Sequence, residues 1–347
     1  MRVALVSPYD LGLPGGVQDQ VVQLSHWLED LGHESMVVGP GDSGPEGAIL
    51  IGSTRSIRAN RASTPIALNP AVSKRLKQAV DDADVVHIHE PLMPFVSAVA
   101  TAIDTHPTVG TFHADPPTWA RFGYRVGSSV WSRLIGRIDV VTTVSNVSES
   151  AIAPFVDARV IPNGVDIALY GGGAKARNRV VFLGRDDERK GLQVLLDAWP
   201  SVLEIVPDAE LVVIGAIRDD HIPGVTYLGR VNDEDKRAEL AAAEIFCAPN
   251  LGGESFGIVV AEGMASECAV VASAIPAFID VLSDSGVLTP PGDVNSLAEA
   301  LVSLLTNTDL MRRRQASAFS AVGRFDGISV ARQYVNAYED AVSLHRS

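Results

Sequence analysis

The sequence predicts an α/β protein made of two doubly wound domains in tandem. Short apolar runs alternate with amphipathic segments through both halves of the chain, and the composition changes near residue 170. A length of 347 residues leaves room for two full hydrophobic cores. Strands that alternate with helices are typical of parallel sheets joined by crossover helices.

The first half contains six apolar runs that predict strands. The segment after the first run has Val17, Val21, Leu24 and Leu28 at helical spacing, which predicts a helix with one apolar face. The predicted strands are 2–6, 35–39, 48–51, 84–88, 107–112 and 139–144.

The second half repeats this alternation after a polar, glycine-rich break at 171–178, which predicts a linker. We therefore expect domains at 1–168 and 175–328, followed by a last helix within 329–347. Ligands of such sheets bind beyond the carboxyl ends of the strands, so two facing domains imply a cleft. The predicted strands are 179–183, 210–215, 225–228, 245–248, 269–272 and 286–288.

The composition excludes several classes of function. A net charge of -14 argues against nucleic acid as a general partner. No run approaches the roughly 18 apolar residues of a spanning helix, so we expect a soluble protein that could still touch a membrane. Cys247 and Cys268 lie in apolar runs and predict reduced core thiols. His87 and His89 alternate on a strand pattern without further metal ligands nearby.

The most informative segment is Gly-Gly-Glu-Ser-Phe-Gly-Ile-Val-Val-Ala-Glu at 252–262. Its glycine pair predicts the start of a helix that carries Glu254 in its first turn and Glu262 eight residues later. Eight residues are just over two turns, so both carboxylates are expected on one face. A helix start binds anions, and such a segment could hold both ends of a sugar nucleotide. The alternative is an ordinary helix with an acidic first turn.

Cations after the predicted strand 179–183 form a second candidate. Gly184 and Arg185 follow this strand, and Lys190 precedes another helix pattern. A glycine with arginine and lysine nearby is a plausible clamp for a diphosphate. The alternative is a solvated run of charges.

Two weaker candidates follow strands of the first half. The turn Pro14-Gly15-Gly16 opens a helix, and glycine lets backbone approach a ligand closely. It is not a G-x-G-x-x-G fingerprint, and a plain tight turn explains it as well. His113 lies just past the strand 107–112, at the end where sites form, although a lone histidine is as often structural.

Segment 47–80 has six basic residues and no acidic one. Residues 70–80 predict an amphipathic helix with Lys74, Arg75 and Lys77 on its polar face. Basic amphipathic helices dock on anionic membrane surfaces. An ordinary surface helix is the alternative.

Together these residues resemble the retaining glycosyltransferases of family 4, whose GT-B fold has two Rossmann-like domains facing an interdomain cleft. The likeness covers essentially the whole chain. Within the family it is strongest to the phosphatidylinositol mannosyltransferases of actinobacteria. The matching strings are P-Y (8–9), P-G-G-V-Q (14–18), H-I-H-E-P (87–91), T-F-H (111–113), I-P-N-G-V-D (161–166), F-L-G-R-D-D-E-R-K-G (182–191) and G-G-E-S-F-G-I-V (252–259).

The resemblance implies transfer of mannose, with retention, from GDP-mannose to the inositol of a membrane phospholipid. It implies a cytoplasmic enzyme at the inner face of the plasma membrane, without a catalytic metal, whose last helix packs back on the first domain. The implied catalytic residues are His113, Arg185, Lys190 and Glu254. The implied donor contacts are Gly16, Arg185, Lys190, Val231, Lys236, Glu254, Ser255, Phe256, Gly257, Ile258 and Glu262. The implied acceptor contacts are Tyr9, Gln18, Asn60, His113 and Arg121, and the implied membrane contacts are Lys74, Arg75 and Lys77.

Two positions depart from the family pattern. Thr118 stands where the family has a lysine near the lipid phosphate, with Arg121 the only base nearby. Ala216 follows Val213-Ile214-Gly215 where a polar residue is usual, and Arg218 lies two residues further on. Alternatives therefore remain: a family 4 enzyme with a UDP-sugar and a soluble acceptor, a sugar-nucleotide epimerase on the same fold, or a non-catalytic nucleotide-sugar or membrane-surface binding protein.

Overall fold

The computed structural model describes residues 1–52, 55–59, 62–66, 71–113 and 128–346. The chain divides into two compact units. Met1–Gly164 and Gly327–Ser347 form the first, and Val165–Asp326 forms the second. Segment 165–174, which precedes the second domain expected from the sequence, groups with the second unit.

The first unit is built on a seven-stranded parallel sheet, which confirms the α/β prediction. The strand order is β3-β2-β1-β6-β7-β8-β9. The short strand β9 and an antiparallel hairpin, β4–β5, were not predicted. The strands are β1 (Arg2–Val6), β2 (Glu34–Gly39), β3 (Ile49–Leu50), β4 (Arg55–Ala59), β5 (Ala62–Ile66), β6 (Val85–His89), β7 (Thr108–Phe112), β8 (Val140–Thr143) and β9 (Arg159–Val160).

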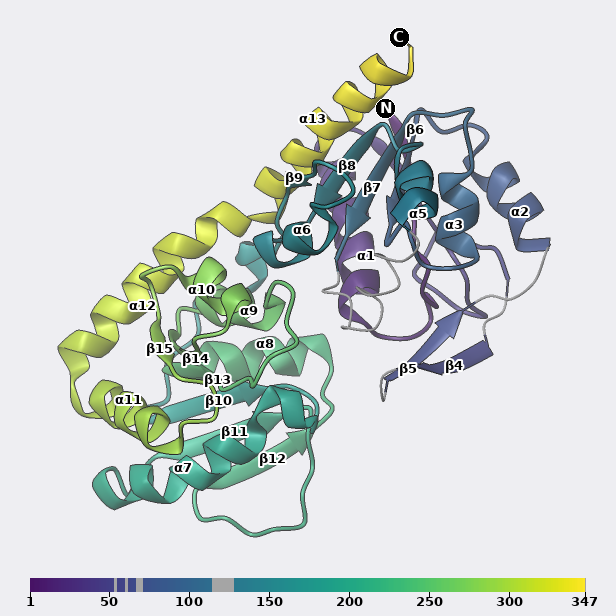
Figure 1. Cartoon of the computed structure of the whole chain (residues 1–347). Helices are drawn as coiled ribbons and strands as arrows, with labels where there is room; N and C mark the ends of the chain where they lie inside the picture. Colours follow the sequence, from purple (N-terminus) through teal and green to yellow (C-terminus); the bar gives the residue numbers. More distant parts are fainter. Residues whose placement is uncertain (53–54, 60–61, 67–70, 114–127, 347) are drawn as a thin grey trace. The chain divides into compact units, whose positions relative to one another are not determined.

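Helices cover both faces of this sheet because its central strands are apolar on both sides. Val3 and Leu5 of β1 pack with α1 and α13, whereas Ala4 and Val6 pack with α2 and α3, which lie side by side in Figure 1. The helices are α1 (Gly16–Asp30), α2 (Ala71–Val80), α3 (Val96–Thr101), α5 (Ser128–Ile135), α6 (Asn146–Ile152) and α13 (Gly327–His345).

The second unit repeats the design around a six-stranded parallel sheet of order β12-β11-β10-β13-β14-β15. Helices α7 and α11 pack together over one face, around the buried Trp199 (Figure 1). The strands are β10 (Arg179–Leu183), β11 (Glu210–Ile214), β12 (Val225–Gly229), β13 (Ile245–Ala248), β14 (Ala269–Ser273) and β15 (Val287–Thr289). The helices are α7 (Leu192–Ile205), α8 (Asp233–Ala242), α9 (Ile258–Ala265), α10 (Pro276–Leu282), α11 (Val294–Thr306) and α12 (Thr308–Val322), with 3-10 turns η1 (Ile167–Leu169), η2 (Glu188–Lys190) and η3 (Gly323–Phe325).

Each sheet has one point where its strand order reverses. In the first unit this point lies between β1 and β6, and in the second between β10 and β13. The loops that leave the carboxyl ends of two such strands diverge and leave a crevice where ligands of doubly wound sheets bind. The loops after β10 and β13 carry Arg185, Lys190 and Glu254, three of the residues that the sequence singled out in the second unit.

Candidate functional site

The loop after β13 corrects one prediction. Helix α9 begins only at Ile258, so Glu254 lies in the loop before it and does not share a helix with Glu262. Gly253 and Gly257 have φ of +73° and +96°, a left-handed conformation that cannot continue a right-handed helix. The glycine pair therefore shapes a loop, and it is Gly257 that caps α9.

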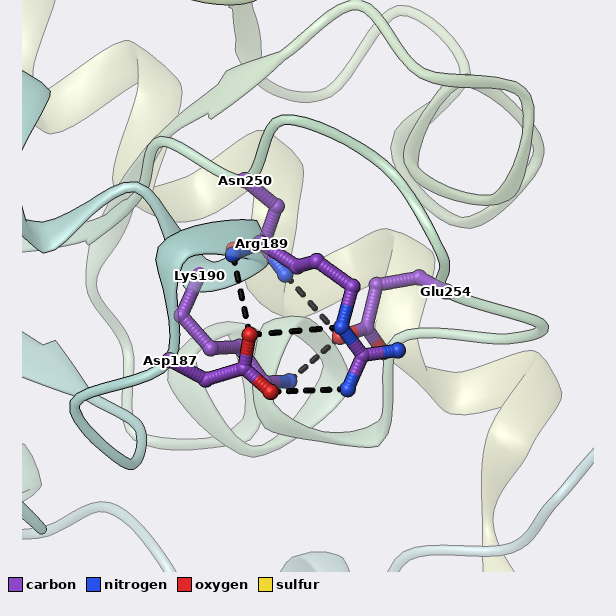
Figure 2. Close-up of polar contacts among 5 residues, drawn as sticks. All are labelled: Asp187, Arg189, Lys190, Asn250 and Glu254. Atoms are coloured by element: carbon purple, nitrogen blue, oxygen red, sulfur yellow. Dashed lines mark hydrogen bonds and ion pairs between the residues drawn. The ribbon is translucent and has the colours of Figure 1, made fainter. Parts of the chain in front are cut away.

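Three side chains meet in this loop (Figure 2). Both the Nζ atom of Lys190 and the Nδ2 atom of Asn250 donate to Oε1 of Glu254, Asn250 over 2.9 Å. Asn250 is only 2 % exposed, so its amide is a fixed part of the site. The predicted residues Lys190 and Glu254 are thus in direct contact, and each is about one fifth exposed.

The two loops are also joined through their backbones. The amide of Leu251 donates to the carbonyl oxygen of Arg189 over 2.8 Å. Gly191 has a φ of +69° and caps the end of η2, where it lies against the backbone carbonyl group of Pro249. These backbone contacts fix the positions of the two loops, and so of Lys190 and Glu254, relative to each other before any ligand binds.

Replacing Gly191 by alanine is expected to lower the free energy of unfolding by at least about 2 kcal/mol, because left-handed backbone strains a side chain. A Cβ at this position would also lie 1.9 Å from the carbonyl oxygen of Pro249. Urea unfolding measures the change. Gly323→Ala is the control, since Gly323 has helical angles and open space around it, and this change should be neutral or stabilising. Equal stability of the two variants would contradict the prediction.

A second ion pair borders this cluster. Arg189 donates to both carboxylate oxygens of Asp187, over 3.3 and 2.8 Å, as drawn in Figure 2. The hydrogen bonds from Arg189 lower the pKa of Asp187 to about 2. Arg185 is exposed, and it forms no ion pair with any carboxylate in the described parts of the chain. Its guanidinium is available to an incoming anion.

Glu262 lies in α9 and contacts two side chains from other parts of the second unit. Tyr170 donates a hydrogen bond to its Oε1 atom over 2.7 Å, and Lys236 of α8 lies 3.0 Å from the same oxygen. Burial lowers the pKa of Lys236. The negative charge of Glu262 and the hydrogen bond that Lys236 donates to it raise this pKa by a larger amount, so the net shift is upward. Both contacts use Oε1, and no hydrogen bond or ion pair from the described residues reaches Oε2 of Glu262.

The other residues expected at the donor have mixed surroundings. Phe256 is only 6 % exposed and packs edge-on against Phe325, with ring centroids 5.2 Å apart. Gly16 begins α1 in the first unit, with open space where a Cβ would stand. Residues that are half-buried are Val231, Ser255 and Ile258.

His113 follows β7 in the first unit and is 7 % exposed. Its Nε2 atom lies 2.8 Å from Nδ1 of His89, and its backbone amide donates to Glu90. Burial lowers the pKa of His113 to about 4, against an opposing hydrogen bond with Asn163, so the ring is neutral near pH 7. The enclosed space beside it has a volume of about 10 Å³, room for one water and not for a sugar.

The remaining predicted acceptor residues lie around the loop after β1 or outside the described structure. Gln18 donates to the carbonyl oxygens of Asp10 and Leu13, which fixes this loop against α1. Tyr9 is half-buried in the same loop. Asn60 and Arg121 lie outside the described residues.

Helix α2 has the predicted amphipathic form. Val72, Leu76 and Val80 are buried, and the side chains of the opposite face are exposed. That face carries Lys74, Arg75 and Lys77. None of the described helices is long and apolar enough to cross a bilayer.

Several residues at these sites were not found from the sequence. Asn250 is a polar residue just past a buried strand, and that position was the available signal. Tyr170 reaches Glu262 from 92 residues away, which no local pattern encodes. Arg218 was noted in the sequence beside the Ala216 departure, but its two hydrogen bonds with Asp186, which anchor the loop next to Arg185, were not predicted.

Comparisons with known proteins identify the family of the chain. Residues 14–169 match the family model described as Glycosyltransferase Family 4, and residues 177–307 match the model described as Glycosyl transferases group 1. A phosphatidyl-myo-inositol mannosyltransferase of Mycobacterium leprae is 38 % identical over 98 % of this chain and 96 % of that protein. Its counterpart in Mycolicibacterium smegmatis is 36 % identical over 98 % and 94 % of the two chains.

Solved structures agree on the fold. Anabaena HepE in complex with UDP has a TM-score of 0.76 at 18 % identity, over 98 % of this chain and all of that one. A sucrose-phosphate synthase of Thermosynechococcus elongatus has a TM-score of 0.72 at 20 % identity, over 97 % and 98 % of the two chains. Similarity at this level of identity supports the GT-B architecture of two doubly wound units.

Proposed function

Because the chain belongs to glycosyltransferase family 4, we propose that it transfers mannose from GDP-mannose to a phosphatidylinositol-type lipid. The observation that carries this proposal is the pairing of Lys190 with Glu254 at the reversal point of the second sheet. Nearly full-length relatives at 36–38 % identity that are named phosphatidyl-myo-inositol mannosyltransferases support the choice of sugar and acceptor.

In this proposal the donor occupies the crevice beyond β10 and β13. Its diphosphate binds Lys190 and Arg185. Lys190 is already paired with Glu254, and Arg185 is exposed. Asn250 then keeps Glu254 in place for the mannose, while Glu262 binds the ribose with its second oxygen. Val231 and Lys236 would lie near the base.

The reaction needs charge stabilisation more than proton transfer. As the bond between the sugar and the diphosphate breaks, negative charge grows on the leaving phosphate. Preorganised cations stabilise that charge without having to reorganise. Lys190 fits this role because Glu254 and the chain around Gly191 already fix its position.

Glu254→Ala and Glu262→Ala are expected to weaken donor binding in different ways. Loss of Glu254 should weaken binding of GDP-mannose much more than binding of GDP, because it removes a contact to the sugar. Loss of Glu262 should weaken both, because it removes a contact to the ribose. Calorimetric titration of each variant with both ligands measures the difference. Equal losses of GDP affinity in the two variants would contradict this division of roles.

A panel of donors tests the sugar nucleotide. The melting temperature of the protein is measured with GDP-mannose, GDP, UDP-glucose or UDP added. A larger shift with the GDP ligands is expected. A preference for the UDP ligands would favour a family 4 enzyme with another donor.

The lipid acceptor requires contact with a membrane, and α2 is the proposed contact. Replacing Lys74, Arg75 and Lys77 by serine should weaken binding to anionic vesicles by orders of magnitude, since each basic residue near such a surface contributes about 1 kcal/mol. Donor affinity should not change, because none of these three residues is an expected donor contact, and all the expected donor contacts except Gly16 belong to the second unit. Vesicle sedimentation at low salt measures the loss.

The matched control removes the same charge elsewhere. Arg312, Arg313 and Arg332 are exposed on α12 and α13, and their replacement by serine should leave vesicle binding nearly intact. If both triple variants lose binding equally, net charge and not α2 would be responsible. If the natural protein ignores anionic vesicles, the lipid acceptor itself becomes untenable.

A further inference from the structure

Segment 170–176, which leads into the second sheet, is fixed on helix α9. The backbone amide of Gly172 lies 3.4 Å from Oε1 of Glu267, just past the end of this helix. The Nζ atom of Lys175 donates to the carbonyl oxygen of Ser266, the residue that caps α9, over 2.6 Å. The predicted linker is therefore attached to the helix that carries the second carboxylate of the donor site.

The first residue of this segment brings a hydroxyl group to that carboxylate. Tyr170 donates to Oε1 of Glu262 over 2.7 Å. Gly171 and Gly172 follow with φ of +82° and +72°, left-handed angles that favour glycine. A Cβ on Gly171 would lie 2.9 Å from a carboxylate oxygen of Glu267. The glycine pair thus lets the chain approach α9 directly after Tyr170.

Tyr170 is the donor in this bond. Burial and the negative charge of Glu262 both raise the pKa of Tyr170, so its hydroxyl keeps its proton near pH 7. The side chain of Glu262 is only 12 % exposed, which limits competition from water. A hydrogen bond to an ionised acceptor is stronger than one between neutral groups.

The other cationic partner of the same oxygen is less rigid. Lys236 lies 3.0 Å from Oε1 of Glu262, but its ammonium also lies 3.1 Å from Asp233. A lysine has a flexible four-carbon stem, whereas the ring of a tyrosine is placed by two torsions. Tyr170 therefore restrains the carboxylate of Glu262 more tightly than Lys236 does.

Two donors on one oxygen determine where the other oxygen points. The last torsion of a glutamate is broad, so an unrestrained carboxylate rotates and exchanges its two oxygens. With Oε1 of Glu262 bound by Tyr170 and Lys236, the direction of Oε2 is restricted. An acceptor that is already oriented loses less entropy when a ligand hydroxyl binds to it. Hydroxyl groups of a ribose are suitable donors for such a carboxylate oxygen.

We propose that Tyr170 is a positioning residue, whose hydroxyl orients Glu262 so that Oε2 accepts a hydrogen bond from a ribose hydroxyl of the donor nucleotide. Tyr170 thereby strengthens the preference of the site for ribonucleotides. This inference rests on the proposed function for the assignment of the ribose to Glu262. It depends on neither the base nor the transferred sugar, because GDP and UDP contain the same ribose. The competing explanation is that Tyr170 only stabilises a buried carboxylate.

Tyr170→Phe removes the hydroxyl and keeps the ring. Calorimetric titration with GDP and with 2′,3′-dideoxy-GDP, which lacks both ribose hydroxyls, separates the two explanations. The affinity for GDP should fall about threefold to tenfold, as for loss of a typical hydrogen bond, while the affinity for the dideoxy compound changes less than about twofold. Unchanged affinities together with a lower melting temperature would show a purely structural role and overturn the proposal.

A double-mutant cycle tests whether Tyr170 acts through Glu262. Glu262→Gln removes the charge of the carboxylate and should itself weaken GDP binding. If the hydroxyl of Tyr170 acts by orienting this carboxylate, adding Tyr170→Phe to Glu262→Gln should cause little further loss. A second loss as large as the loss in the natural background would place the effect elsewhere and overturn the proposal.

Lys175→Met is the matched control, because Lys175 fixes the same segment to α9 without contacting Glu262. It should lower the melting temperature and leave the ratio of the GDP and dideoxy-GDP affinities unchanged. If this ratio falls as far as in Tyr170→Phe, movement of the segment and not the hydroxyl would be responsible, and the proposal would be wrong.

The same titrations separate this proposal from the proposed function. If the natural protein binds neither GDP nor UDP, the proposed function fails, and the role of Tyr170 fails with it. If the natural protein prefers GDP to the dideoxy compound and Tyr170→Phe keeps the same preference, only the role of Tyr170 is contradicted. Neither result requires transfer of mannose.

Discussion

Lys190→Ala and Arg185→Ala are each expected to lower turnover about a hundredfold or more, because loss of one preorganised contact to developing negative charge costs about 2.7–4 kcal/mol of barrier. Lys190 is the stronger case. It is about one fifth exposed and already bound to Glu254, so its ammonium is aimed into the site before the donor binds. Steady-state transfer from GDP-mannose gives the effect, and thermal melting verifies that the variants fold.

The control for these variants lies on the same strand. Arg179 begins β10 and pairs with Glu210 and Glu239 at the end of the sheet opposite the ligand crevice. Arg179→Ala removes the same charge and should keep near-normal turnover. If Arg185→Ala and Lys190→Ala behave like Arg179→Ala, the two cations do not clamp the diphosphate.

His113→Ala is expected to abolish transfer while GDP still binds with its normal affinity. The reason is that His113 is not among the expected nucleotide contacts, which belong to the second unit apart from Gly16. A lost hydrogen bond to the transition state alone is worth about a hundredfold or more in rate. Calorimetry with GDP and a transfer assay with GDP-mannose measure the two effects separately.

Because His113 is 7 % exposed, its removal also disturbs packing. His113→Asn keeps a side-chain amide that can form hydrogen bonds, and it should retain more activity than His113→Ala. Equal activity of these two variants would argue against a hydrogen-bonding role for His113. Loss of GDP affinity in His113→Ala would contradict the assignment of the nucleotide to the second unit.

The sequence predicted the two sheets well because buried parallel strands leave a simple signal. Runs such as Val180–Phe182 and Val3–Val6 are apolar on both faces, and helices alternate with them at regular intervals. Short edge elements left no such signal. Strand β9 has two residues, both exposed, and the β4–β5 hairpin carries polar and basic residues.

The site was predicted less completely, for a physical reason. Glu254 and Glu262 were recognised as residues, but the helix expected to carry both begins after Gly257, whose left-handed backbone is invisible in an apolar periodicity. The partners of these carboxylates come from elsewhere in the chain. Tyr170 and Lys236 are far from Glu262 in sequence, and only the folded sheet brings them to it.

The buried histidines His87, His89 and His113 illustrate the same limit of sequence reasoning. His87 and His89 alternate on a strand, which the sequence shows, yet alternation places them on one face without indicating their partners. His113 directly follows the neighbouring strand β7, and the register of β6 with β7 sets His89 opposite Thr111. That pairing brings the two imidazoles to hydrogen-bond distance.

The most direct test of the central claim is transfer of radiolabelled mannose. Purified protein is mixed with GDP-[¹⁴C]mannose and vesicles that contain phosphatidylinositol, and lipid-soluble label is counted over time. The account predicts label in a phosphatidylinositol mannoside, with little label when UDP-glucose replaces the donor or when Lys190 is replaced by alanine. Absence of labelled lipid with the natural protein, under conditions where it binds GDP-mannose and the vesicles, would contradict the account.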